Sequence, residues 1–193
     1  MHDEGAMTEP RTQAKLTGED LLEIQATTGK SYELIEGELV EMSPTSGVHG
    51  AIEFNIALLL GQHVRQHKLG QIVVGEAGFY VRGDEHTVRG ADIAFISAAK
   101  MPPEGLPTGF LKIAPDLVVE VVSPNDRGVE IVEKVGEWLA FGVAAVWVVY
   151  PNTRSVHVYT DPRSSRILSA DDRLEGSGAL AGFSTPVRAF FEG

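Results

Sequence analysis

The chain has 193 residues, of which 43% are apolar and 22% charged, a composition typical of one folded domain rather than of a disordered chain. It contains no cysteine, which excludes disulfides and thiolate metal sites, and no apolar stretch of the roughly 20 residues that a membrane-spanning helix needs. The formal net charge of −11 argues against a broad surface for nucleic acid. We therefore expect a cytoplasmic protein without membrane contact, in which any binding of nucleic acid is local.

The first part of the chain predicts a helix followed by a hairpin. Thr17 with two acids behind it is typical of a capped helix start, and the helix is expected to run to about Ala26. The alternating residues 32–42 predict a tight β-hairpin that turns near Glu36 and Gly37.

The next part predicts a long helix and two strands. Apolar side chains recur at spacings of three and four residues, so an amphipathic helix is expected over 48–67, ended by Gly70. Strands are expected over 71–81 and 88–96.

The remaining residues again alternate between strands and a helix. We predict a long loop over 97–115, a buried strand over 116–122, a helix over 127–141, and strands over 144–150 and 155–159. The weakly patterned remainder, 161–193, leaves room for two short strands.

This order of elements predicts an α/β (α+β) fold with a mixed β-sheet flanked by helices and an N-terminal β-hairpin. We interpret residues 1–16 as a flexible N-terminal lead and residues 17–193 as a single domain.

Glu120 lies in the middle of the apolar run 116–122 (DLVVEVV), which predicts a strand covered on both faces. An ionised carboxylate buried there costs several kcal/mol or more unless a cation, a metal ion or hydrogen-bond donors meet it. The sequence therefore predicts a positive charge beside Glu120.

Asp92 and Lys134 are the other two residues that we expect at this point. If their strands are neighbours, the carboxylates of Asp92 and Glu120 converge and suit a hard divalent cation such as Mg²⁺. Lys134 lies at the margin of the apolar stripe of the predicted helix 127–141, from which its ammonium group can reach Glu120. Carboxylates, a metal ion and an ammonium group together supply what phosphodiester hydrolysis needs.

Each of these residues also has a simpler interpretation when it is taken alone. Asp92 can cap a turn at the start of a strand, and Glu120 can form a structural ion pair with Arg89 or another base. Lys134 can form an exposed helical pair with Glu130, four residues earlier. Only the combination of the three favours a catalytic site.

Several segments resemble the Uma2 family, formerly a domain of unknown function, of the PD-(D/E)XK restriction-endonuclease-like superfamily. They are 32–39 (YELIEGEL), 42–44 (MSP), 89–96 (RGADIAFI), 114–124 (APDLVVEVVSP) and 142–151, together with His49, Glu130 and Lys134. The resemblance implies a restriction-endonuclease-like mixed sheet flanked by helices and a DNA endonuclease that depends on Mg²⁺, with Mn²⁺ as a possible substitute.

The resemblance also implies roles for single residues. Asp92 matches the first metal-binding acid and Glu120 the second. The residue two positions after Glu120 is Val122, where the superfamily motif has lysine, and Lys134 is the candidate for that lysine relocated to the helix. Ala91 stands where the motif usually has proline.

Three further residues are supporting candidates: Glu33, Glu36 and His49. An isolated histidine at a helix start is more often a local cap or a surface residue than a ligand.

The first functional hypothesis is therefore a Mg²⁺-dependent endonuclease that hydrolyses phosphodiester bonds in DNA. The alternative is a catalytically weak or inactive protein of the same fold that serves as a binding or assembly module, which the net charge and Val122 favour. A third hypothesis is an enzyme that acts on a small phosphorylated or nucleotide substrate. Apolar faces that include Phe54, Trp138 and Trp147 predict a homodimer, although burial in the core would explain them equally well.

Overall fold

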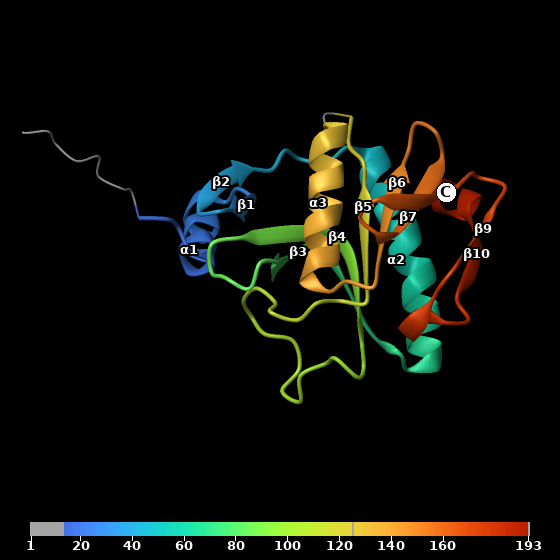
Figure 1. Ribbon diagram of the computed structural model, residues 1–193, viewed down its shortest axis with the longest axis horizontal. Helices are drawn as coiled ribbons and strands as arrows, with labels where there is room; N and C mark the ends of the chain where they lie inside the picture. The colour runs from blue at the N-terminus through green and yellow to red at the C-terminus, as the bar shows by residue number, and fades with distance from the viewer. Residues whose placement is uncertain (1–13, 125, 193) are drawn as a thin grey trace, which may run out of the picture.

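The computed structural model describes residues 14–124 and 126–192, which form an eight-stranded sheet with helices on its faces and a strand hairpin at one end (Figure 1). This α+β architecture confirms the predicted fold class. The helices and strands are α1 (Gly18–Thr28), β1 (Tyr32–Ile35), β2 (Glu38–Glu41), α2 (Gly47–His67), β3 (Gly70–Tyr80), β4 (Val88–Ser97), β5 (Leu117–Val121), α3 (Gly128–Phe141), β6 (Ala145–Tyr150), β7 (Ser155–Asp161), β8 (Ser164–Leu168), β9 (Arg173–Glu175) and β10 (Ser184–Pro186), with short 3₁₀ turns at Gly178–Leu180 and Val187–Phe190.

The N-terminal end of the described chain packs on the hairpin. Of the predicted flexible lead, residues 1–13 lie outside the described residues. Leu16 donates a backbone hydrogen bond of 3.3 Å to the carbonyl of Gly37 and contacts the small apolar cluster around Leu21 and Leu34.

Helix α1 begins as the sequence predicts. The Thr17 hydroxyl accepts a hydrogen bond from the Asp20 backbone N–H, and the Asp20 carboxylate accepts one from the Thr17 backbone N–H. This reciprocal capping satisfies two N–H groups that the helix itself leaves free.

Helix α2 also lies where it was predicted, but the prediction that Gly70 ends it is wrong. Lys68 ends the helix in the left-handed conformation, with φ 55°, and its N–H reaches the carbonyls of Val64 and Arg65. Gly70 instead begins β3.

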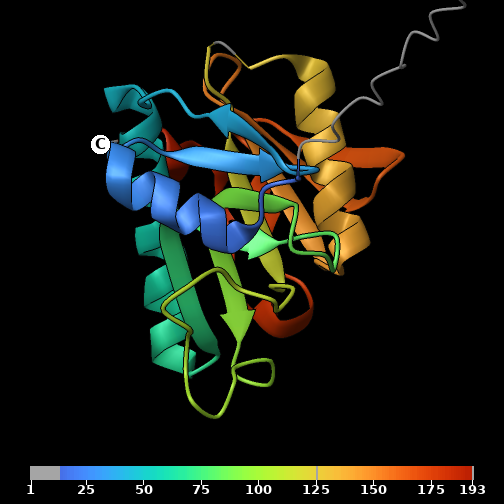
Figure 2. The same ribbon diagram turned by 90° about the vertical axis from the view of Figure 1, so that its left-hand side faces the viewer.

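The two long helices cover opposite faces of the sheet. In Figure 2 the sheet lies between α2 and α3. The buried side chains of α2 recur at helical spacing, at Ile52, Ile56, Leu60 and Val64. On α3, Val135 and Trp138 are buried.

Strand β4 alternates between these two layers. Ile93 and Phe95 pack in the layer under α2, whereas Ala94 and Ile96 pack in the layer under α3. Strands β5 and β6 run parallel and are joined by α3, as a parallel pair requires a long crossover. Glu120, one residue from Val119 of the α2 layer, therefore faces α3.

Strand β4 has one partner strand along one edge and two partner strands along the other. One edge pairs with β3 over nearly its whole length, from Val88 to Ser97. The other edge must serve two partners, β1 at Val88 and β5 from Ile93 to Phe95. Asp92 lies between these two partners, where the sheet opens.

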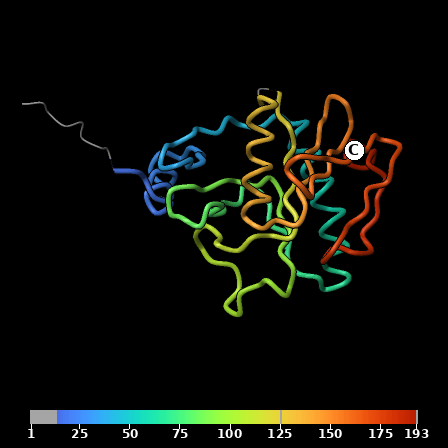
Figure 3. The backbone as a smooth tube through the Cα atoms, viewed as in Figure 1, coloured from blue at the N-terminus to red at the C-terminus, as the bar shows by residue number. Residues whose placement is uncertain are grey.

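The loop between β4 and β5, expected over 97–115, leaves the sheet and returns to it, as the tube in Figure 3 shows. Leu111 ties it to β3, because its carbonyl accepts from the Tyr80 N–H and its own N–H donates to Gly78, both at 2.9 Å.

The C-terminal part holds more regular structure than its sequence predicts. Residues 161–193 were expected to leave room for two short strands, whereas the structure has three (β8, β9 and β10) and two 3₁₀ turns. None of the helices in the described residues is long and apolar enough to span a membrane.

Two of the three aromatic residues that suggested a homodimer are buried within the chain. Trp138 is 0% exposed and Trp147 is 2% exposed, so the core accounts for both. Phe54, on α2, is 64% exposed and remains on the surface.

Candidate active site

Polar side chains from five elements gather where the sheet opens beside β4. Hairpin strand β1 provides Glu33, β4 provides Asp92 and β5 provides Glu120, while α2 and α3 provide His49 and Lys134. The last residue pair in the register of β4 and β5 at this end is Ile93 with Val119, so the next pair would be Asp92 with Glu120. The sheet thus brings the strand positions of the two acids together from 28 residues apart.

Asp92 is held from the β5 backbone and from α2. Its Oδ2 accepts a hydrogen bond of 2.6 Å from the Val121 N–H and lies 3.3 Å from His49 Nε2. Burial alone would raise the pKa of Asp92, but the bonds from His49 and Val121 outweigh it and lower the pKa. The hydrogen bond to Asp92 raises the pKa of His49. The pair therefore favours a carboxylate beside an imidazolium.

His49 is more than the local cap or surface residue that its position predicts. Ser46 caps α2, because its hydroxyl accepts from the His49 backbone N–H at 3.2 Å. The His49 side chain is only 4% exposed, and within the described residues its Nδ1 has no hydrogen-bond partner.

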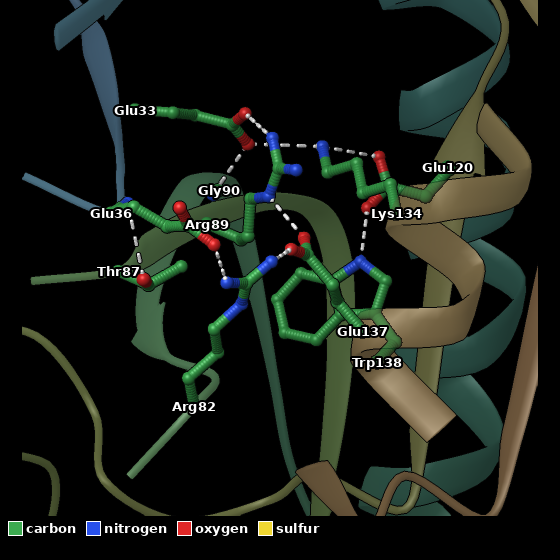
Figure 4. A network of polar contacts seen from close by, with 10 residues as sticks. All are labelled: Glu33, Glu36, Arg82, Thr87, Arg89, Gly90, Glu120, Lys134, Glu137 and Trp138. Atoms are coloured by element: carbon green, nitrogen blue, oxygen red, sulfur yellow. Dashed lines mark hydrogen bonds and ion pairs between the residues drawn. The ribbon is translucent and has the colours of Figure 1, made fainter. Parts of the chain in front are cut away.

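Glu120 receives two donors from α3, as Figure 4 shows. Trp138 Nε1 donates to Oε1 at 2.8 Å, and Lys134 Nζ donates to Oε2 at 3.0 Å. The two donors are four residues apart and so share one face of the helix. Burial raises the pKa of Glu120 to about 7, with Lys134 opposing the rise and Asp92 adding to it.

Lys134 bridges β5 and β1. Besides Glu120, its Nζ lies 3.2 Å from Glu33 Oε1. The expected surface pair of Lys134 with Glu130 does not form, because Glu130 pairs with Arg127 instead. Burial would lower the pKa of Lys134, but the carboxylates of Glu120 and Glu33 raise it, so the ammonium group stays charged at neutral pH.

Glu33 connects the site to a row of ion pairs (Figure 4). Its carboxylate accepts from the Gly90 N–H at 2.9 Å and from Arg89 Nη1 at 2.8 Å. Arg89 Nε in turn donates to Glu137 at 2.6 Å. Arg89 therefore pairs with Glu33 and Glu137 rather than with Glu120, whose basic partner is Lys134.

Glu36 lies at the far end of this row, away from Asp92 and Glu120. It pairs with Arg82, whose other guanidinium nitrogen lies 2.7 Å from Glu137. Its side chain is 59% exposed. Of the supporting candidates, the structure thus brings Glu33 and His49 to the site and leaves Glu36 at its border.

Two further acids lie beside Asp92 and were missed in the sequence. Glu76 occupies a β-bulge in β3, and Glu53 projects from α2, with Oε1 3.4 Å from the Gly75 N–H. Burial, followed by the charge of Asp92, raises the pKa of both, that of Glu76 to about 8. The only signal for the bulge was a glycine–glutamate pair that interrupts the predicted strand 71–81.

Asp92 and Glu120 share no side-chain partner among the described residues, since Asp92 is held from α2 and Glu120 from α3. Their charges nevertheless interact. Asp92 raises the pKa of Glu120, and Lys134 lowers the pKa of Asp92.

The donors at this point are oxygens, which suit Mg²⁺ rather than a soft metal. In the described part of the chain, no three His, Asp or Glu side chains are arranged as a ready-made metal-binding group. Mg²⁺ does not require one, because it usually keeps several waters and binds through one or two carboxylates. Glu76 Oε2 is also buried and has no hydrogen-bond partner within the described residues, so a cation bound here would give it a partner. The side chains therefore fit this ion.

A family comparison covers most of the chain. Residues 19–188 match the model of the Uma2 family, described as "Putative restriction endonuclease". The chain belongs to the Uma2 family. This confirms the resemblance on which the predicted roles of Asp92 and Glu120 rest, while the roles themselves stay predictions.

The fold of this Uma2 protein is also found in a solved structure. A crystal structure described as that of a putative nuclease belonging to DUF820, from Anabaena variabilis ATCC 29413, superposes with a TM-score of 0.77. It covers 91% of this chain and 97% of its own, at 18% sequence identity, which shows a shared fold. No curated protein matches the sequence.

Proposed function

We propose that this Uma2 protein is an endonuclease that hydrolyses phosphodiester bonds in DNA with Mg²⁺ as its cofactor and Mn²⁺ as a substitute. The observation that carries the proposal is the ammonium group of Lys134, held 3.0 Å from Glu120, next to the opening in the sheet that holds Asp92. The family description and the nuclease-like fold support the same class of reaction.

Asp92 and Glu120 are the residues that would hold the cation. When bound, the ion would polarise the scissile phosphate and lower the pKa of a coordinated water. Asp92 meets this role as a carboxylate with a lowered pKa, kept in place by Val121 and His49. His49 is thus a positioning residue, which acts through Asp92.

Lys134 supplies a fixed positive charge rather than a base. Its raised pKa keeps it protonated, so it can stabilise negative charge that develops on the phosphate or orient the attacking water. The usual lysine position holds Val122, whose side chain packs with the apolar layer under α3. Lys134 of α3, four residues before Trp138, instead places a positive charge beside the carboxylate of Glu120.

Plasmid nicking in Mg²⁺ or Mn²⁺ tests the proposal. The wild-type protein should nick supercoiled DNA only when a divalent cation is present, and Asp92→Ala and Glu120→Ala should each lose at least about a hundredfold in rate, as expected when a group that stabilises the transition state is removed. Glu38→Gln, which removes an exposed charge on β2, serves as the matched control. Cleavage retained in both folded alanine variants would overturn the assignment.

A binding or assembly module is the second candidate, favoured by the net charge of −11 and by the absence, within the described residues, of a preformed three-ligand metal group. It predicts a folded protein whose melting temperature does not change with divalent cations and which does not cleave DNA. The nicking experiment and a thermal melt therefore separate the two candidates.

We also propose a cytoplasmic homodimer. The exposed Phe54 is the remaining aromatic residue that supports dimerisation. Sedimentation of the wild-type protein and of Phe54→Ser would test it, with a monomer at both high and low concentration as the contradicting result.

A further inference from the structure

Glu76 lies on a β-bulge directly opposite Asp92. Strand β3 pairs Val74 with Ile93 and Ala77 with Ala91, so Gly75 and Glu76 together face the single residue Asp92. Bulges of this kind redirect a side chain and are common beside active sites. Glu76 itself has a φ of 59°, a left-handed conformation that is unfavourable for a residue with a side chain.

One oxygen of the Glu76 carboxyl group has no hydrogen-bond partner among the described residues. This atom, Oε2, is buried, and burial together with the neighbouring acid Asp92 raises the pKa of Glu76 to about 8. A buried carboxylate that lacks donors costs free energy, and a nearby like charge adds to the cost. Lys134 is a cation near Glu76, but its Nζ is bound to Glu33 and Glu120.

Gly90 makes room for this carboxylate. A Cβ atom at position 90 would lie 2.8 Å from Glu76 Oε2, closer than such atoms approach in proteins. Three consecutive strands, β3, β4 and β5, therefore present acids at one level of the sheet, with Asp92 in the middle. The bulge is what brings the third acid to that level.

We propose that Glu76 is a further ligand of the divalent cation, which it reaches from the bulge on the side of Asp92 opposite Glu120, so that the ion draws together three acids that are not preassembled within the described residues. This inference rests on the proposed function, because it concerns the same ion. It assigns a role to the unfavourable backbone at the bulge: the conformation holds a carboxylate where the cation would give it a partner.

Calorimetric titration of Mn²⁺ into the full-length protein tests the inference without reference to activity. Glu76→Gln keeps the shape of the side chain and removes its charge, while Gly90→Ala keeps the charge and displaces the carboxylate. Residues that only support metal ligands cost about 10–100-fold in affinity when they are removed, so both variants should weaken Mn²⁺ binding at least tenfold. Glu38→Gln should bind like the wild type, and Asp92→Asn should bind far more weakly.

The melting temperature in EDTA separates a ligand from a structural residue. Glu76→Gln replaces a buried carboxyl group whose Oε2 has no hydrogen-bond partner within the described residues, so without metal, above pH 8 where Glu76 is ionised, it should melt no lower than the wild type, and it should gain less from added Mn²⁺. A lower melting temperature in EDTA together with unchanged Mn²⁺ affinity would show a structural role and overturn the inference.

The remaining outcomes distinguish the inference from the proposed function. Wild-type affinity in both Glu76→Gln and Gly90→Ala, with loss in Asp92→Asn, would overturn the role of Glu76 and leave the endonuclease proposal standing. No Mn²⁺ binding by the wild type at millimolar concentration would overturn both. Should Glu76→Gln fail to fold, Gly90→Ala decides the matter alone.

Discussion

Two groups of acids lie side by side in this protein, and they differ in how far positively charged side chains neutralise them. Glu33 and Glu137 belong to a row of ion pairs in which Arg89 binds both carboxylates. Around Asp92, by contrast, Glu76 has no hydrogen-bond partner among the described residues for its buried oxygen, and burial raises the pKa of Glu120 despite its contact with Lys134.

This difference separates the acids that the folded structure itself neutralises from those that remain short of positive charge. A buried carboxylate with an arginine partner is accounted for by the stability of the structure. A buried carboxylate that remains short of positive charge is a better candidate for binding a cation from outside. Lys134 touches both groups, because it contacts Glu33 and Glu120.

The largest effect is expected at this junction. Lys134→Met should abolish DNA cleavage and destabilise the fold, because it leaves two carboxylates without their shared cation. Removing one partner of a buried ion pair costs about 3–5 kcal/mol, which corresponds to roughly 6–20 °C in melting temperature for a chain of this size. Thermal melts and nicking assays measure the two losses. An unchanged melting temperature in Lys134→Met would show that Lys134 is solvated and does not join the two groups.

A smaller effect, confined to stability, is expected within the row of ion pairs. Arg89→Met leaves Glu33 and Glu137 without their common partner and should cost about 3 kcal/mol by the same reasoning. Since Arg89 is assigned no part in cation binding, Mn²⁺ affinity should change little. Calorimetry and a thermal melt on the same sample separate the two quantities. An Arg89→Met variant that keeps its melting temperature but loses Mn²⁺ binding would contradict the division of the acids into a group that stabilises the fold and a group that binds the cation.

The sequence predicts the positions of the acids on the strands more readily than it predicts the residues that surround them. The strand predicted over 88–96 and the apolar run 116–122 place Asp92 and Glu120 on strands, and the helical stripe of α3 puts Lys134 at a margin from which it can reach Glu120. The structure has that contact. These inferences work because the periods of strands and helices are fixed by backbone geometry.

Long-range pairing limits what the sequence predicts elsewhere. The bulge at Glu76 exists only relative to β4, so its position opposite Asp92 follows from the register of two strands and not from either strand alone. The burial of His49 similarly depends on how the start of α2 meets the opening in the sheet. Only the family resemblance indicated His49, and the sequence offered no signal for Glu76 beyond the glycine–glutamate pair at the bulge.

A third prediction concerns pH and the uncompensated acids. In EDTA, the raised pKa values of Glu120, about 7, and Glu76, about 8, mean that the folded state holds protons which the unfolded chain, with ordinary values near 4.5, has released. The stability of the metal-free protein should therefore fall as pH rises from about 5 to 9. Each tenfold difference in acidity is worth about 1.4 kcal/mol, so the decline should amount to a few kcal/mol. Glu76→Gln should make it shallower.

Divalent cations should reverse this trend. Binding requires deprotonated carboxylates, so the stabilisation that Mn²⁺ provides should grow over the same rise in pH. Melting temperatures at pH 5.5, 7 and 8.5, with EDTA or with Mn²⁺, measure both slopes. A metal-free protein whose stability rises through this range would contradict the account of Glu76 and Glu120.

The smallest effect is expected at His49. His49→Gln should weaken the orientation of Asp92 and cost about 1.5–3 kcal/mol, the range for a hydrogen bond that involves a charged group. Because His49 acts through Asp92, the variant should lower cation affinity severalfold without abolishing it. Calorimetric titration of Mn²⁺ checks this. A loss as complete as that of Asp92→Asn would instead make His49 a direct ligand.

The position of a bound cation tests the central claim most directly. Crystals soaked with Mn²⁺ and measured at its absorption edge would locate the ion by anomalous scattering. We predict one strong peak at coordination distance from the carboxylates of Asp92 and Glu120, near the ammonium group of Lys134. A fully soaked crystal with no peak there, or with its peak among other acids, would contradict the proposed site.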